Sequence, residues 1–381
     1  MLPVLGAASL LASFRAPSNF AVHDIATGLT GGYQVIAADL NRDGKPDLVA
    51  LASGLPELVW FENPSWTRHV IASGMRGLIN VAATDLDGDG IPELAVASGF
   101  STRPDQSSGD VALFTHGSDP TQPWTMRVID HVPSAHRLRW YTDRDGQRWL
   151  INSPLAASTA RPPNYDGATP IYVYRAPEFK RDSLPSEEAG VVHAVEPMRA
   201  PFCDACLLSA GFAGIHRYEH SNAGWAHALV TGGSSAPVPK SGSSDVAVGR
   251  LRGAHFLAAI EPWHGNQVVV YRPSAGGGPL TRQVIDTSVV DGHTLVTADL
   301  DGDGVDEVIV GQRGGSRSVW IYTANRDGTA WTRTALDDGG MAAAGCVATD
   351  LNGDARVDVA CIGTATANLK WYENLGAARQ P

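Results

Sequence analysis

Four short stretches of the chain carry acidic or amide side chains at the spacing of a cation-binding loop. Each reads Asp, any residue, Asp or Asn, any residue, Asp, and then a further acid four positions later. Alternate carboxylates on one tight loop converge on a point, where they repel one another unless a cation lies between them. Oxygen-only ligands favour a hard cation, and Ca²⁺ accepts the roughly six to eight oxygens that such a loop offers. The pattern therefore predicts calcium at Asp39, Asn41, Asp43 and Asp47; at Asp85, Asp87, Asp89 and Glu93; at Asp299, Asp301, Asp303 and Glu307; and at Asp350, Asn352, Asp354 and Asp358.

The position after the third ligand residue distinguishes one of these loops from the others. It is glycine in three loops and Ala355 in the last. Glycine permits the left-handed backbone of a sharp bend, whereas a residue with a Cβ atom is strained there. We therefore expect the last loop to bind calcium more weakly or with strain. A degenerate fifth copy, without the end ligands, stands at Asp143 and Asp145.

Histidine is the second residue type that offers chemistry. Five of the 12 histidines lie in five separate segments: His136, His193, His216, His264 and His293. Neighbouring neutral imidazoles bind zinc or another transition metal, and they act as general bases. These segments show no nucleophile elbow, no phosphate-binding glycine loop and no close pair of glycosidase-type carboxylates. This combination favours proton abstraction beside a carbonyl, as in an elimination, a dehydration or an isomerisation.

A repeat of about 50 residues must position both features, and this period is typical of propeller blades. Each repeat opens with an aromatic-Thr-Arg strand, continues with a hairpin of two apolar strands, and closes with a third apolar strand that carries an aromatic residue. Clear opening strands occur at residues 66–71, 124–129, 280–285 and 331–336, weaker copies begin at 179 and 225, and a seventh spans 20–25. Four strands in each of seven units predict an all-β, seven-bladed β-propeller over residues 19–381.

The two chain ends explain how the ring closes. The last repeat stops after its third strand, and the chain begins with a spare strand at residues 20–25. Closure by this N-terminal strand accounts for both facts and removes an open sheet edge. The acidic loops join the first and second strands of their blades, so all of them lie on one face. First-strand starts and second-strand ends then surround the central channel on the opposite face, and the five histidines are assigned to these positions.

Charge and the N-terminal segment bear on partners and location. The net charge of −11 argues against nucleic acid, which binds clustered Lys and Arg. No stretch approaches the roughly 18 consecutive apolar residues of a transmembrane helix. Residues 1–18 have the length and the small-residue ending of a signal peptide but no positively charged start. They are either an incomplete export signal or a disordered leader, and we expect a secreted or periplasmic protein.

Four cysteines form two pairs in the sequence. Cys203 and Cys206 make a lone CxxC, which is an unremarkable pair, a disulfide or half of a metal site. Cys346 and Cys361 flank the last acidic loop at nearly equal offsets, so they should face each other across the hairpin. They are either bridged or packed as thiols.

The chain resembles known proteins in two respects. The acidic loops resemble the FG-GAP or VCBS repeats of integrin-type propellers, which implies the fold and calcium but not a function. The segments at 136–140, 261–265 and 291–293, with those at 337–346 and 368–374, resemble the propeller domain of aldos-2-ulose dehydratase and its bacterial relatives. That resemblance implies the elimination of water from keto-sugars such as 1,5-anhydrofructose, with a metal site and histidine chemistry. The fungal enzyme continues into cupin domains that perform a later isomerisation, so only the elimination step is expected here.

The expected function is therefore that of a metal-dependent carbohydrate lyase of the dehydratase type. It would act by β-elimination on a keto-sugar of the 1,5-anhydrofructose or 3-keto glycoside type. The expected roles are a rim metal, zinc or another transition ion, on His264 and His293; a proton-abstracting base at His136 or His216; oxyanion stabilisation by Arg137 or Arg139; orientation of a ligand histidine or protonation of the leaving hydroxyl by Glu261; and substrate contacts from Tyr33, Trp263, Arg313 and His193.

A second interpretation is a non-enzymatic module, in which a calcium-stabilised propeller presents a binding face for glycans or proteins. It accounts for the acidic loops and the aromatic residues, but not for the concentration of histidines. A third is a structural subunit of a larger envelope complex. A transition-metal assay discriminates the first two, because the binding module requires calcium alone.

Overall fold

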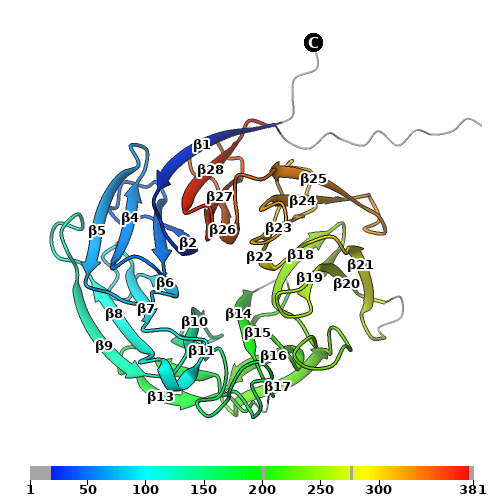
Figure 1. Ribbon diagram of the computed structural model, residues 1–381, viewed down its shortest axis with the longest axis horizontal. Coiled ribbons are helices and arrows are strands. Elements are labelled where there is room, and N and C mark those ends of the chain that lie inside the picture. Colours follow the sequence, from blue (N-terminus) through cyan, green and yellow to red (C-terminus); the bar gives the residue numbers. More distant parts are fainter. Residues whose placement is uncertain (1–18, 187, 200–201, 275–277, 377–381) are drawn as a thin grey trace, which may run out of the picture.

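The computed structural model describes residues 19–186, 188–199, 202–274 and 278–376. Within these residues, 28 strands form seven four-stranded antiparallel sheets, and one short 3-10 helix, η1 (Pro104–Gln106), interrupts them. The sheets stand around a central axis as the blades of a disc (Figure 1). The predicted all-β, seven-bladed propeller is confirmed. The predicted leader, residues 1–18, lies outside the described residues.

Each blade runs from an inner strand at the axis to an outer strand at the circumference. In chain order the blades are β2 (Gly32–Ala38), β3 (Asp47–Ala52), β4 (Glu57–Glu62), β5 (Thr67–Ser73); β6 (Asn80–Thr84), β7 (Glu93–Ser98), β8 (Asp110–Thr115), β9 (Thr125–His131); β10 (Ala135–Thr142), β11 (Arg148–Pro154), β12 (Tyr172–Arg175), β13 (Lys180–Ser183); β14 (Val192–Arg199), β15 (Ala205–Gly211), β16 (Gly214–Ser221), β17 (Gly224–Thr231); β18 (Asp245–Leu251), β19 (Ala254–Glu261), β20 (Gln267–Arg272), β21 (Thr281–Asp286); β22 (Gly292–Ala298), β23 (Glu307–Gln312), β24 (Val319–Ala324), β25 (Trp331–Asp337); and β26 (Ala343–Thr349), β27 (Asp358–Gly363), β28 (Asn368–Asn374), β1 (Phe20–Thr27).

The seventh blade is closed by the N-terminal strand. β1 pairs antiparallel with β28, from Phe20 opposite Asn374 to Thr27 opposite Asn368. Figure 1 shows the blue β1 alongside the red β28. The sequence-based expectation of closure is confirmed, and the outer edge of β28 is covered by a strand from the other end of the chain.

The core lies between neighbouring blades. The second strands β3, β7, β23 and β27 are buried along their whole lengths, which explains why their sequences are nearly continuous apolar runs. One core cluster joins Leu48 and Phe61 of the first blade to Ile362 and Leu369 of the last. The inner strand β26 also contacts β2, so packing between blades continues around the ring without a break.

A β-bulge interrupts five of the inner strands of the described chain close to their start. In each case one residue has no partner in the register of the second strand, and these residues are Tyr33, His136, His193, His293 and Ala344. A bulge re-aims the side chain that it leaves unpaired, and bulges are frequent beside functional sites. Here they place corresponding residues of neighbouring blades at one end of the central channel, opposite the acidic loops.

Both cysteine pairs are disulfide-bonded. Cys346 lies directly opposite Cys361 in the pairing of β26 with β27, as expected from their offsets around the loop. Cys203 and Cys206 are bridged across the turn that precedes β15. In the described part of the chain, no helix has the length and hydropathy needed to cross a membrane.

Candidate functional site

Three histidines from consecutive blades converge at the channel end that carries the bulges. His193 comes from β14, His293 comes from β22, and His264 lies in the turn after β19. One ring nitrogen from each lies within 4.8 Å of the others. The Nε2 atoms of His193 and His264 are 3.2 Å apart. We call His193, His264 and His293 the three-histidine centre.

Backbone carbonyls of the next blade fix the orientation of two of these rings. His193 Nδ1 lies 2.8 Å from the carbonyl oxygen of Ser244, and His293 Nδ1 lies 2.7 Å from that of Ala344. A carbonyl oxygen only accepts, so Nδ1 carries the proton and donates it in both rings. The lone pair is therefore on Nε2, which faces the other histidines. This arrangement is typical of imidazoles that bind a metal through Nε2.

The third ring is held by a carboxylate and an arginine. His264 Nδ1 lies 3.1 Å from Asp291 Oδ1, and Arg313 donates two 3.0 Å hydrogen bonds to the Asp291 carboxylate. Arg313 Nη2 also lies 2.8 Å from His264 Nδ1. Two tautomers are thus accommodated: Nδ1 either accepts from Arg313 or donates to Asp291. Donation to Asp291 frees the Nε2 lone pair, which gives the centre its third ligand atom.

The backbone at this third ring is strained. His264 has φ 47° and Asp291 has φ 55°, both in the left-handed region. Such conformations cost roughly 1–3 kcal/mol each for residues other than glycine, and they cluster at functional sites. Arg313, which bridges the two residues, contributes to holding them in place.

Burial favours the neutral form of the histidines at this end of the channel. Burial lowers the pKa of His136, His193 and His293 well below the usual value, and nearby arginines lower it further. Burial also lowers the pKa of His264, while Asp291 opposes that effect. Among the described residues, His293 Nε2 is buried without a hydrogen-bond partner. Because a buried unpaired nitrogen is destabilising, a cation at this point would supply the partner that the protein does not.

A second cluster adjoins the three-histidine centre. The hydroxyl of Tyr33 lies 2.8 Å from His136 Nε2, and Arg137 Nη1 lies 3.2 Å from the same nitrogen and 3.3 Å from the hydroxyl. Since arginine only donates, His136 Nε2 is the acceptor, and the Tyr33 hydroxyl is free to donate to it as well. His136 is 1% exposed, whereas Tyr33 is half-buried. The ring of Tyr33 is 5.0 Å from that of His293, so the phenol lies between the two clusters.

Trp263 forms an apolar wall beside the centre. Its ring lies 4.7 Å from that of His264 and 6.4 Å from that of His193. Tyr165 and Phe212 pack edge-on against it. The predicted substrate-contact residues Tyr33, Trp263, Arg313 and His193 therefore all lie at this end of the channel, with His193 as part of the centre itself.

His216 was assigned to the wrong strand. The sequence pattern predicted it at the end of a second strand, but β15 ends at Gly211 and His216 is the third residue of β16, a third strand. Its Nδ1 lies 2.7 Å from Nε2 of His227 on the outer strand. The weak repeat of this blade hides the turn at residues 212–213, which moves His216 away from the axis.

Glu261 and Arg139 are also placed differently from the prediction. Glu261 ends β19 with its side chain turned into the blade, where it accepts from Tyr271 and pairs with Arg282 at 2.7 Å, so it does not orient a ligand histidine. Asp291 takes that place, and the sequence signal for it was the Asp-Gly-His run that ends at His293. Arg139 lies deeper in the channel, 2.6 Å from Glu196, rather than beside the histidines.

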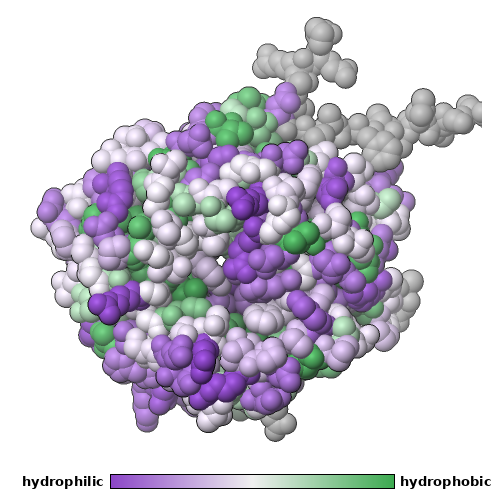
Figure 2. Space-filling view, viewed as in Figure 1, coloured by the Kyte–Doolittle hydropathy of each residue, from purple (hydrophilic) through white to green (hydrophobic). Residues whose placement is uncertain are grey.

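A cavity of about 530 Å³ connects this end of the molecule with the channel below it. Tyr33, Arg137 and His293 are among the residues that line it, together with residues of several inner strands. The volume falls in the range of roughly 300–1,000 Å³ that is typical of small-molecule sites. Figure 2 shows the hollow at the centre of the disc, with hydrophilic residues beside it.

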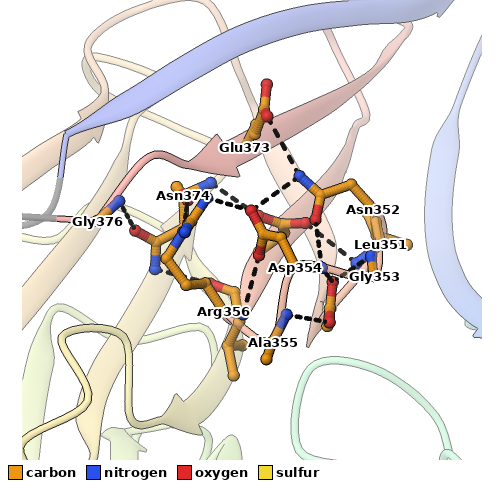
Figure 3. A network of polar contacts seen from close by, with 12 residues as sticks. Leu351, Asn352, Gly353, Asp354, Ala355, Arg356, Glu373, Asn374 and Gly376 are labelled. Atoms are coloured by element: carbon orange, nitrogen blue, oxygen red, sulfur yellow. Dashed lines mark hydrogen bonds and ion pairs between the residues drawn. The ribbon is translucent and has the colours of Figure 1, made fainter.

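The four acidic loops share one hydrogen-bond frame. The second oxygen of the first aspartate accepts from the backbone amide five residues later, at Gly44, Gly90, Gly304 and Ala355. Carboxylate oxygens of Asp85, Asp87 and Glu93, and of Asp299, Asp301 and Asp303, converge within 4.8 Å. Figure 3 shows the fourth loop, where Arg356 contacts Asp354, the third ligand residue.

The last acid of each loop is buried. Burial raises the pKa of Asp47 to about 7 and that of Glu307 to about 8, and the neighbouring acids add to the effect. Both oxygens of Asp47 and of Asp358 accept backbone amides, whereas Glu93 and Glu307 each accept one, from Leu86 and Leu300. The loops that end in glutamate therefore keep an oxygen available for a cation.

The degenerate fifth loop is satisfied by side chains instead. Asp143 accepts from the indole nitrogen of Trp149 at 3.0 Å and from His220 Nδ1 at 2.9 Å. The Asp143 carboxylate is therefore hydrogen-bonded by two side-chain donors.

Comparisons with known proteins agree with the propeller fold and with the predicted resemblance to aldos-2-ulose dehydratase. The model of the FG-GAP-like repeat matches residues 39–96 and 299–361, and the model of the aldos-2-ulose dehydratase β-propeller domain matches residues 108–274. Aldos-2-ulose dehydratase of Phanerodontia chrysosporium is 28% identical over 253 residues, which cover 56% of this chain and 27% of that protein. The aligned part is thus about a quarter of the length of that relative. Both resemblances predicted from the sequence are confirmed.

Solved structures support the architecture alone. The crystal structure of BBS1N in complex with ARL6DN, soaked with lead, gives a TM-score of 0.59 at 12% identity and covers 97% of this chain and 99% of that one. A chain of the mitotic checkpoint complex gives 0.59 at 11% identity, with coverage of 98% and 96%.

Proposed function

We propose that this propeller is a metal-dependent carbohydrate lyase of the dehydratase type, which eliminates water from a keto-sugar at the three-histidine centre. The distant similarity to the aldos-2-ulose dehydratase propeller supports a role of this kind. The observation that carries the proposal is the convergence of three imidazoles, one of which, His293, also lines a cavity of about 530 Å³.

The donor set fits a transition metal. Three imidazole nitrogens with no protein carboxylate among them match the His₃ type of catalytic site, which leaves a position open for substrate. His193, His264 and His293 would hold the ion, and the unpaired Nε2 of His293 would gain its missing partner. A bound ion would supply a Lewis acid that polarises the carbonyl of the keto-sugar.

The acid–base pair consists of Tyr33 and His136, and Arg137 lies beside this pair as its cationic partner. The half-buried phenol is the group that substrate reaches. His136 Nε2 behind it first takes the phenolic proton, and the phenolate oxygen then takes the proton from the carbon next to the carbonyl. Arg137 stabilises the negative charge on the phenol oxygen. The carbon–oxygen bond at the next carbon then breaks, a carbon–carbon double bond forms, and the same pair returns the proton to the departing hydroxide as water.

Asp291 and Arg313 position His264 in this scheme, and Trp263 offers a face against which a sugar ring packs. Asp291 replaces Glu261 as the orienting acid because it is the carboxylate that contacts a ring of the centre, at 3.1 Å. Burial raises the pKa of Asp291, but the hydrogen bonds from His264 and Arg313 outweigh this effect and keep the pKa far below its usual value. Asp291 is therefore an anion that favours Nδ1–H on His264.

We further propose that the acidic loops bind calcium as scaffold, most strongly in the two loops that end in Glu93 and Glu307. Carboxylate oxygens converge in both loops, and burial together with the neighbouring acids raises the pKa of Glu93 and Glu307, so a cation there would offset the repulsion among these acids. The two disulfides suit an oxidising compartment, which supports the expectation of export.

Alanine variants of His193, His264 and His293 test the proposed function. Each should reduce keto-sugar consumption at least about a hundredfold and lose the bound transition ion, with the calcium-dependent stability kept. His131→Ala is the matched control, because His131 is 70% exposed on the outer strand β9. Full activity in all three variants would overturn the site. Calcium without a transition ion, and no consumption of keto-sugars by the wild type, would favour the binding module.

A further inference from the structure

The channel below the three-histidine centre carries charged side chains that the elimination does not use. Arg139, Glu196 and Asp245 come from the inner strands of three consecutive blades, and all three line the same cavity as Tyr33 and His293. Arg139 and Glu196 each keep about a quarter of their side-chain surface accessible, at 24% and 25%. These groups therefore face the interior of the channel.

Two of the three are already paired, and the third is not. Arg139 binds Glu196 through two nitrogens, at 2.6 and 3.2 Å, and Arg139 Nη1 also lies 3.3 Å from the Asn80 side-chain oxygen. Among the described residues, Asp245 accepts a hydrogen bond only from the backbone amide of Val246. Burial and the nearby Glu196 raise the pKa of Asp245 to about 7. Asp245 is thus a carboxyl group without a side-chain partner.

Basic and acidic side chains both line this part of the channel. Arg137 and Arg139 face Glu196 and Asp245, so the channel suits neither a free anion nor a free cation. Hydroxyl groups are the ligands that match such a mixture, because each can donate to a carboxylate and accept from a guanidinium. Met198, Val248 and Val296 supply apolar surface for the carbon–hydrogen faces of a ring.

We propose that this part of the channel is a second subsite, which binds a neutral glycosyl unit through Asp245, Glu196 and Arg139. The substrate class is then a keto-glycoside, whose oxidised ring lies at the three-histidine centre and whose further sugar enters the channel. Only the identity of the reacting ring rests on the proposed function. Binding of the further sugar rests on the channel residues themselves.

Binding of ordinary disaccharides tests the subsite without any turnover. Titration calorimetry compares cellobiose, maltose, trehalose and sucrose with glucose on the wild type, on Asp245→Ala and on Asp245→Asn. At least one disaccharide should bind the wild type at least tenfold more tightly than glucose. Asp245→Ala should weaken that disaccharide at least tenfold, and Asp245→Asn, which keeps a hydrogen-bonding side chain, should weaken it less. Asp182→Asn on the exposed outer strand β13 is the matched control.

Each outcome is decisive for one of the two proposals. If no disaccharide binds more tightly than glucose, or if Asp245→Ala and Asp245→Asn both bind as the wild type does, the subsite is wrong even where keto-sugars are consumed. If a disaccharide binds through Asp245 but no keto-sugar or keto-glycoside is consumed, the proposed function fails and the subsite stands.

Discussion

At the scale of single residues, the site depends on what fixes each ring nitrogen. His193 and His293 are oriented by backbone carbonyl oxygens of Ser244 and Ala344 in the next blade. Since every residue type has this carbonyl, the side chains at those two positions matter little for the orientation. His264 depends instead on one side chain, Asp291. Substitution of a neighbouring side chain should therefore leave the orientation of His193 and His293 unchanged, whereas it can change the orientation of His264.

Asp291→Asn should weaken the transition ion about 10- to 100-fold, because the amide no longer holds a proton on His264 Nδ1 as an anion does. Asparagine tolerates the left-handed backbone at this position, so folding should be unaffected. Competition with a chromophoric chelator measures the affinity. Asp338→Asn on the exposed loop after β25 is the control. Equal affinity of the Asp291 variant and the wild type would remove Asp291 from its positioning role.

Ala355→Gly should stabilise the protein by about 1 kcal/mol, because Ala355 adopts φ 65° where the other loops have glycine. The melting temperature in calcium measures this effect. Ala228→Gly, on the exposed outer strand β17, should instead be destabilising, since its backbone is regular. A loss of stability in both variants would show that the left-handed alanine carries no strain.

At the scale of elements, the repeat of about 50 residues predicts the features that recur in every blade. The outer strands, the places of the acidic loops and the closing role of β1 all follow from this repeat. The bulges do not, because one extra residue at a strand start leaves the buried run of the second strand unchanged. His193 therefore appeared as a substrate contact rather than a ligand. The tight turn before His216 and the inward side chain of Glu261 were missed for a similar reason, since neither alters the apolar periodicity.

Removal of residues 1–27 should open the ring, because β28 then loses the strand that covers its edge. We expect the melting temperature to fall by at least about 10 °C, with a shift toward aggregates in size-exclusion chromatography. Removal of residues 1–18 is the control, since it leaves β1 intact. An unchanged melting temperature in the shorter protein would mean that closure by β1 is dispensable.

At the scale of the whole molecule, the two faces of the disc have different tasks. The acidic loops follow the inner strands β2, β6, β22 and β26, and Tyr33, His293 and Ala344 lie at the other ends of three of these strands. His136 and His193 lie at the same face on β10 and β14, which belong to blades without an intact acidic loop. Each inner strand that carries an acidic loop therefore connects a proposed cation site to the channel mouth. Calcium would stabilise the strands that carry Tyr33 and His293 without touching the substrate.

Calcium removal should lower the melting temperature, and calcium should restore it. A cation that binds only the folded protein stabilises it by about 2.7 kcal/mol at a hundredfold excess over its dissociation constant. Glu93→Gln and Glu307→Gln should reduce this calcium-dependent shift. Asp143→Asn should leave the shift unchanged, because Trp149 and His220 replace a cation there. A melting temperature that is the same in chelator and in calcium would contradict the scaffold role.

The most direct test of the central claim is a metal titration of the metal-free protein, kept in calcium, with absorbance of the unsaturated product as readout. We predict that keto-sugar turnover is absent without a transition ion, rises linearly and saturates at one equivalent per chain, and stays absent at every equivalent in His293→Ala. Turnover that is independent of added transition ion, or a bound equivalent of ion that produces no turnover, would contradict the assignment of the three-histidine centre as the site of elimination.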